Sequence, residues 1–127
     1  MEIEFSNAQG NNFTFELQSA CVSLTKVKIV GDYQVDQADP GDLAIGTVMI
    51  LPDYFPGQAN IRTKHSQVLR VLAEGGVTAG DRVKLGTDDG DGNQRYAEWV
   101  QGTDDISLVE GHCVKGGTDA EIHILTD

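Results

Sequence analysis

Three oxygen-bearing side chains in one glycine-rich loop have the spacing of calcium ligands. Asp89, Asp91 and Asn93 match positions 1, 3 and 5 of an EF-hand loop. The glycine that such a loop needs at its sixth position is replaced by Gln94, and the glutamate due at the twelfth is Val100. We therefore favour a polar hairpin loop over a calcium site.

The histidine, cysteine and serine residues do not form a motif typical of metal binding or nucleophilic catalysis. His65, His112 and His123 belong to no His-x-His, His-Glu-x-x-His or Cys-x-x-Cys spacing. There is no Gly-x-Ser-x-Gly motif, and no glycine-rich phosphate loop precedes a helical segment. The sequence predicts a protein that is not an enzyme, with no catalytic residue, no metal and no cofactor.

Large aromatic residues are the best candidates for contacts with a partner. Tyr54 and Phe55 lie in the segment Pro52–Gly57, which has a loop composition, and Trp99 is the only tryptophan. Aromatic side chains are enriched at the centres of protein interfaces. We expect Tyr54, Phe55 and Trp99 as possible interface residues, although packing in the core is the interpretation that we favour for Trp99.

Composition and charge limit the partners. The 127 residues include 20 acidic and 9 basic side chains, which gives a net charge of −11. Such a charge repels phosphate backbones and anionic lipids, so neither nucleic acid nor membrane is expected as a partner. The beginning of the chain has no signal-peptide pattern, which predicts a cytosolic protein. Cys21 and Cys113 are expected to be buried, reduced thiols.

Alternating apolar and polar residues predict short strands along the whole chain. Residues 1–20 are typical of an N-terminal hairpin. A change of apolar phase within residues 21–30 indicates a β-bulge near Thr25 or Lys26, or a strand that turns a barrel corner. Residues 60–73 fit either a helix or a strand, and we favour a strand over 66–73. We expect a single domain over 1–127, an all-β fold that is a compact barrel or sandwich of short, mostly antiparallel strands, with at most one short helix.

One short pattern occurs twice. Pro40-Gly41-Asp42 and Ala79-Gly80-Asp81 each introduce a strand-like run that ends in Gly-Thr. The repetition indicates the same kind of turn at both places.

The second half of the chain, residues 66–127, carries a resemblance to a known family. Its motifs are the turn Thr78-Ala79-Gly80-Asp81, a pair of strand-like runs around a polar turn, and a Gly116-Gly117 turn before the strand that ends at Leu125. From about Val68 to Leu125, this pattern resembles the head-decoration, or capsid cement, proteins of tailed bacteriophages. The resemblance implies a β-protein that binds the major capsid protein on the outer surface of the virion, as a homotrimer, after assembly in the host cytoplasm. It also implies no enzymatic activity and no cofactor.

Two other functions remain open. A ligand- or glycan-binding β-module of the adhesin type would use an aromatic cleft formed by Tyr54, Phe55 and Trp99. A small β-barrel enzyme would have to assemble its site from residues that are far apart in the sequence.

Overall fold

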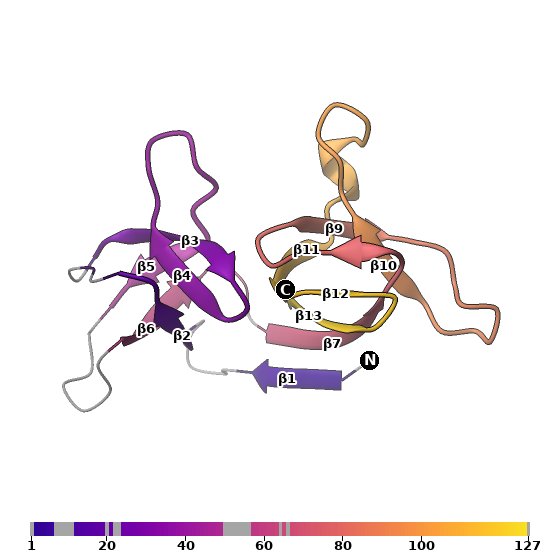
Figure 1. The fold of residues 1–127 in the computed structure, drawn as a ribbon, viewed down its shortest axis with the longest axis horizontal. Coiled ribbons are helices and arrows are strands. Elements are labelled where there is room, and N and C mark those ends of the chain that lie inside the picture. Colours follow the sequence, from indigo (N-terminus) through magenta and orange to yellow (C-terminus); the bar gives the residue numbers. More distant parts are fainter. Residues whose placement is uncertain are drawn as a thin grey trace.

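A computed structural model describes residues 2–6, 12–19, 21, 24–49, 57–63, 65 and 67–126. Within these ranges the chain is all-β, and its single helical element is the 3-10 helix η1 (Ile106–Leu108). The predicted fold class is therefore confirmed: short strands, mostly antiparallel, close into barrels that lie side by side (Figure 1). No helix in this part of the chain has the length and apolar character needed to span a bilayer.

The first barrel is formed by the first half of the chain. Its strands follow the closed order β2-β4-β3-β5-β6, in which β2 and β4 are parallel and the other neighbours are antiparallel. These strands are β2 (Asn12–Leu17), β3 (Lys26–Gly31), β4 (Gln34–Gln37), β5 (Gly46–Val48) and β6 (Gln58–Thr63).

The second barrel has the order β7-β10-β9-β11-β13 and is closed by pairing of β13 with β7. Here β7 and β10 are the parallel neighbours. Its strands are β7 (Gln67–Ala73), β9 (Arg82–Leu85), β10 (Arg95–Glu98), β11 (Gly111–Lys115) and β13 (Glu121–Thr126). A small ribbon of β8 (Gly76–Val77) and β12 (Gly117–Thr118) and the added strand β1 (Glu2–Ser6) complete the described elements.

The two barrels are copies of one topology. Numbered along the chain, the strands of each barrel have the closed order first, third, second, fourth, fifth, with the first and third parallel. The pairing registers also agree: Val27 pairs with Gly46 in the first barrel, and Val83 pairs with Gly111 at the equivalent place in the second. Equivalent strands are β2 and β7, β3 and β9, β4 and β10, β5 and β11, and β6 and β13.

Both copies need glycine at the same position of the fourth strand. A Cβ atom on Gly46 would lie 2.5 Å from the carbonyl oxygen of Arg62, and one on Gly111 would lie 2.8 Å from that of Leu125. Arg62 and Leu125 occupy equivalent positions of the fifth strands. Neighbouring backbones therefore approach so closely in each barrel that a side chain has no room.

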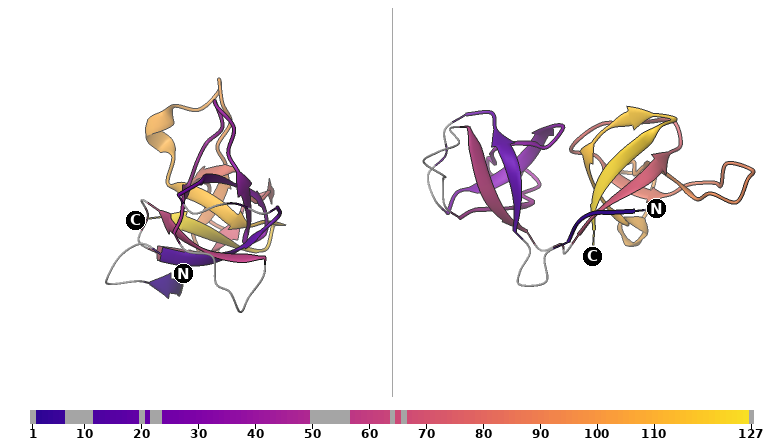
Figure 2. Two further views of the ribbon diagram at one scale, coloured as in Figure 1. Left: turned by 90° about the vertical axis from the view of Figure 1, so that its left-hand side faces the viewer. Right: turned by 90° about the horizontal axis from the view of Figure 1, so that it is seen from below.

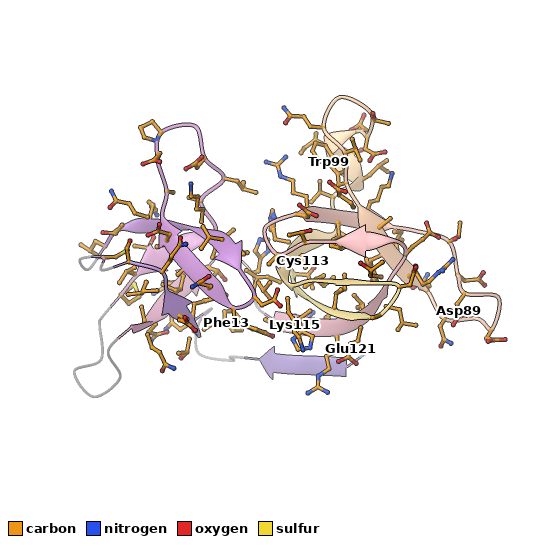
Figure 3. The ribbon with its side chains drawn as sticks, in the orientation of Figure 1. Phe13, Asp89, Trp99, Cys113, Lys115 and Glu121 are labelled. Carbon is orange, nitrogen blue, oxygen red and sulfur yellow. The ribbon has the colours of Figure 1, made fainter. Side chains whose placement is uncertain are left out.

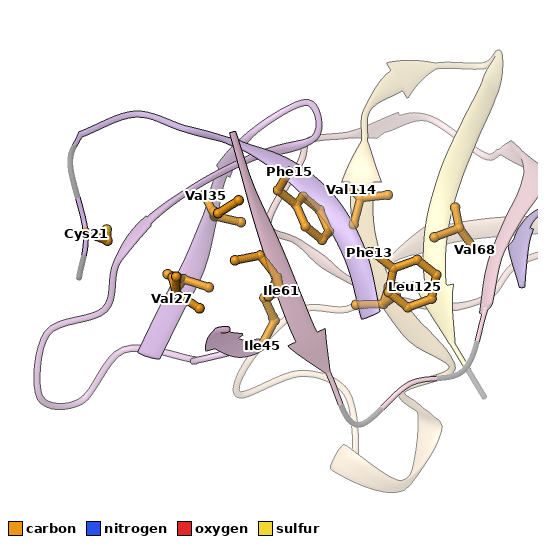
Figure 4. Close-up of a cluster of buried hydrophobic side chains, with 12 residues drawn as sticks. Phe13, Phe15, Cys21, Val27, Val35, Ile45, Ile61, Val68, Val114 and Leu125 are labelled. Atoms are coloured by element: carbon orange, nitrogen blue, oxygen red, sulfur yellow. The ribbon is translucent and has the colours of Figure 1, made fainter. Parts of the chain in front are cut away.

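The apolar core runs from one barrel into the other. Phe13, Phe15 and Ile61 of the first barrel share a buried cluster with residues of the second barrel, among them Val68 and Leu125 (Figure 4). A separate cluster fills the second barrel. Because the first cluster crosses the boundary, the barrels do not have independent cores.

Polar contacts at the β3–β4 turn add to this junction. The Tyr33 amide donates to the carbonyl oxygen of Val114 at 2.7 Å, and the Gly116 amide donates to the Asp32 carboxylate at 2.9 Å. The Tyr33 hydroxyl lies 2.7 Å from Nδ1 of His123. These hydrogen bonds hold the β3–β4 turn of the first barrel against the second barrel. Figure 2 shows the two barrels from two further directions.

The expectation of an N-terminal hairpin was wrong in its pairing. Strand β1 pairs with β7, whereas β2 pairs with β4 and β6. Alternation of apolar residues indicates a strand but not its pairing partner. Strands β1 and β2 are consecutive in the sequence, but they pair with strands of different barrels. The strand favoured at 66–73 is confirmed as β7.

The predicted bulge near Thr25 or Lys26 also lies elsewhere. Strand β3 begins only at Lys26, and its register shifts between Ile29 and Gly31, close to the turn. Leu24 lies before the strand, with φ +71° and its side chain 72% exposed. The apolar phase changes because Leu24 is outside the sheet.

Candidate binding surface

Trp99 is placed by the structure outside both buried clusters, whereas Tyr54 and Phe55 lie outside the described residues. The Trp99 indole is half-buried, and its Nε1 donates to the carbonyl oxygen of Asp105 at 2.8 Å. The Arg82 guanidinium lies over the ring, 5.2 Å from its centroid. A cation held on one face and a hydrogen bond at the edge fix the orientation of the ring.

Trp99 begins the longer of two equivalent loops. Each connects the third strand of its barrel to the fourth, and we call residues 38–45 and 99–110 the paired loops. Both project from the same side of the molecule, at the top of Figure 1 and again in the left view of Figure 2. The repeated topology thus brings two corresponding loops next to each other.

An aspartate holds each of the paired loops in the same way. The Asp42 carboxylate accepts hydrogen bonds from the Asp39 amide at 2.8 Å and from Lys28 Nζ at 2.9 Å. The Asp104 carboxylate accepts one from Lys84 Nζ at 2.7 Å and another from the Val100 amide. Lys28 and Lys84 are equivalent residues of the second strands.

These contacts lower the pKa of both carboxyl groups. For Asp42 the larger cause is the Asp39 amide and the next is Lys28, whereas for Asp104 it is first Lys84 and then the Val100 amide. The anionic forms are therefore stabilised. Each loop begins with the same bridge between its first residues and the adjacent strand.

Exposed aliphatic side chains gather on the paired loops. Leu43 is 39% exposed in the first loop, and Val100, Ile106 and Leu108 are 43%, 62% and 49% exposed in the second. Asp105 caps the 3-10 helix that carries Ile106 and Leu108, because its side chain accepts a hydrogen bond from the Ser107 amide. The loops thus present apolar groups on a backbone that is held by side-chain hydrogen bonds.

A groove of about 570 Å³ lies between the middle of the first loop and the base of the second. Leu43 from the first barrel and Trp99 and Val100 from the second provide its apolar surface. The other lining residues include three acidic ones and one basic one, Asp42, Asp81, Glu98 and Arg82. This groove is the feature that best matches a binding site, because it combines an aromatic ring with a few polar groups.

The Asp88–Asn93 segment is a hairpin loop whose carboxylate binds its own backbone. Oδ1 of Asp89 accepts hydrogen bonds from the amides of Asp91 and Asn93 at 2.8 and 3.2 Å, and Oδ2 accepts from the Asn93 side chain at 2.9 Å. These bonds lower the pKa of Asp89 and are typical of an Asx turn. They support the polar hairpin interpretation. Throughout the described ranges, no three His, Cys, Asp or Glu residues are grouped so that they could hold a metal.

Both cysteines are free and buried, as predicted. Burial is the largest cause that raises the pKa of Cys113, to about 12, and burial also raises that of Cys21. The reactive thiolate is therefore scarce at neutral pH.

A half-buried histidine pair, His65 and His112, joins β11 to the connection between the two barrels. The rings of His65 and His112 are 5.1 Å apart, and Nδ1 of His112 is buried without a hydrogen-bond partner among the described residues. Burial, followed by the charges of His65 and Arg82, lowers the pKa of His112 to about 4. His112 is therefore neutral in the folded protein at neutral pH.

We expect acid to destabilise the protein through His112. Its pKa is about 6.5 in an unfolded chain, so the unfolded state binds the extra proton first. The stabilising contribution is complete above that pH and decreases as the pH falls towards 4, by about 2 kcal/mol at about pH 5. Urea unfolding at about pH 7.5 and at about pH 5 measures it. A His112→Phe variant should lose about 2 kcal/mol less between these pH values, and an equal loss in both proteins would contradict the assignment.

Comparison with known proteins adds no relative: no family model, curated protein or solved structure matches the chain. Sequence reasoning singled out Trp99 of the groove residues but missed Leu43, Arg82 and Glu98. The repeated Gly-Asp pattern pointed to the first of the paired loops, but no signal in the sequence placed it beside Trp99.

Proposed function

We propose that this chain is a structural protein of a bacteriophage virion, which attaches to the outer surface of the capsid and stabilises it. The observation that carries the proposal is the extent of the resemblance to head-decoration proteins. The resembling segment, from about Val68 to Leu125, coincides with the second barrel from β7 to β13. A resemblance that covers a whole closed unit is stronger support than turn motifs scattered over a fold.

The motifs of the resemblance have structural roles within that unit. Gly80 has φ +100° and its amide donates to the carbonyl oxygen of Cys113, while the Asp81 carboxylate accepts a hydrogen bond from the Thr78 amide. At Gly116, a Cβ atom would lie 2.5 Å from the carbonyl oxygen of Val77. These turns connect strands of the barrel and lie outside the paired loops, which leaves the loops available for contact with a capsid.

The physical effect of such binding is a linkage effect. A ligand that binds only the mature lattice stabilises that lattice, and many copies acting together compensate for weak individual contacts. The proposal includes self-association into trimers at three-fold positions of the shell, with assembly in the host cytoplasm.

Cosedimentation with capsid shells tests the proposal. The purified chain is mixed with expanded and unexpanded shells of the major capsid protein encoded in the same genome, and with the unassembled capsid protein. We expect binding to expanded shells, a higher temperature of shell disruption, and a trimeric mass for the bound protein. Failure to bind either kind of shell would refute the proposed function, and a monomeric mass would refute the trimer.

A further inference from the structure

The groove between the paired loops has a lining that selects a particular kind of occupant. One wall is Leu43 from the first barrel, and the other is Trp99 with Val100 from the second. Figure 3 shows Trp99 at the base of the second loop, well away from the hairpin that carries Asp89. Because these walls come from different barrels, the groove exists only when the barrels are joined.

Its charge favours a cation. Three acidic residues, Asp42, Asp81 and Glu98, line the groove together with one basic residue, Arg82. Asp42 is bound to Lys28, and Arg82 lies over the indole ring, whereas Glu98 is exposed. The net charge of −11 adds a long-range attraction for basic surfaces.

Lysine and arginine match both parts of this lining. Their aliphatic stems cover apolar surface while the charged ends remain near carboxylates. A stem that packs on Leu43 and Val100 would place its cationic end in a groove whose lining also includes Glu98 and Asp81. A free metal ion or an anionic group would leave the apolar walls unused.

We infer that the groove between the paired loops binds a lysine- or arginine-bearing surface segment of the capsid subunit. The identity of this partner rests on the proposed function. The acidic groove steers the basic segment electrostatically and holds one of its side chains. The exposed Ile106 and Leu108 extend the contact along the second loop. Since equivalent loops flank the groove, the segment crosses the boundary between the barrels and contacts both.

Trp99 provides a direct measurement, because it is the only tryptophan in the chain. The probe is a short, capped peptide of alternating leucine and arginine, with a leucine and glutamate peptide of equal length as its counterpart. We expect the emission of Trp99 to change saturably with the basic peptide alone, and the change to weaken as salt is added. Glu98→Lys and Leu43→Asp should each weaken the apparent affinity about tenfold.

A matched control separates a local effect from a change in net charge. Asp91→Lys makes the same change of charge as Glu98→Lys, on an exposed residue of the distant hairpin. Leu85→Asp places a carboxylate on another exposed leucine, outside the groove. Both variants should bind the peptide within about twofold of the unchanged protein. Thermal unfolding of all variants verifies that they are folded.

Shell binding by the same variants distinguishes the two proposals. If the unchanged chain binds shells and Glu98→Lys and Leu43→Asp bind as well as the controls, the groove is overturned while the proposed function stands. If the unchanged chain binds no shell but the basic peptide still binds at Trp99, the proposed function fails, whereas the groove stands as a site for a basic segment. Lack of any response of Trp99 to the basic peptide, or a glycan that binds there instead, would overturn this inference.

Discussion

Replacing Phe15 by alanine is expected to lower the free energy of unfolding by about 3–5 kcal/mol, the typical cost of removing a buried aromatic side chain. Phe15 is 1% exposed and belongs to the cluster that continues into Val68, Val114 and Leu125 of the second barrel. We therefore expect the loss to appear in both barrels at once. Urea unfolding followed by circular dichroism and by Trp99 fluorescence measures it, since Trp99 lies in the second barrel.

The two signals distinguish one folding unit from two. Coincident midpoints, shifted together by Phe15→Ala, would show that the barrels unfold cooperatively. If the Trp99 midpoint stays in place while the dichroism midpoint moves, the barrels unfold independently and the prediction fails. Thr14→Ala on the same strand is the control, because Thr14 is exposed and its replacement should change the stability by less than about 0.5 kcal/mol.

Gly46→Ala is expected to destabilise the protein by about 3 kcal/mol, through overpacking rather than a cavity. The new methyl group would lie 2.5 Å from the Arg62 carbonyl oxygen and 2.6 Å from Cγ2 of Ile61, so β5 and β6 would have to separate. Thermal or urea unfolding measures the loss. Gly111→Ala should act in the same direction, because a Cβ atom there would lie 2.8 Å from a backbone oxygen.

A different glycine serves as the comparison for these variants. At Gly76 the nearest atom to an added Cβ is Oγ1 of Thr118, 3.6 Å away, which is an ordinary contact. Gly76→Ala should therefore change the stability little. Equal losses from Gly46→Ala and Gly76→Ala would show that the close approach of β5 and β6 is not the cause.

The strands could be predicted from the sequence because alternation reports burial on one face of a sheet. Phe13 and Phe15 are buried and their neighbours Thr14 and Glu16 are exposed, as their alternation requires. Pairing could not be predicted in the same way, because a strand carries no local record of its partner. That is why residues 1–20 looked like a hairpin although β1 and β2 join different barrels.

The duplication remained hidden for a related reason. Equivalent positions share burial more than identity: Val35 and Tyr96 correspond, and both are buried. The visible repeat, around Gly41 and Gly80, is a true repeat of local structure, with φ values of +93° and +100°. However, it lies before the fourth strand of one barrel and before the second strand of the other, so it does not follow the correspondence of the two barrels.

The candidate groove was predictable only in part. An isolated tryptophan suggests an interface from its chemistry alone, which led to Trp99. Its neighbour Leu43 is 56 positions earlier in the numbering and reaches the groove only because the two barrels pack against each other. Such contacts depend on how the two barrels pack against each other. Local patterns of apolar and polar residues do not determine this packing.

The hairpin between β9 and β10 has a practical consequence. Its counterpart in the first barrel, around Asp32 and Tyr33, is fixed against the second barrel, whereas residues 87–94 are exposed and held by the bonds of Asp89. Exposed loop tips of this kind accept inserted sequence. Since the hairpin extends away from the paired loops (Figure 1), a peptide grafted between Gly90 and Gly92 would leave the groove unobstructed. Under the proposed function, a shell that carries many copies of the grafted chain would display the inserted peptide multivalently.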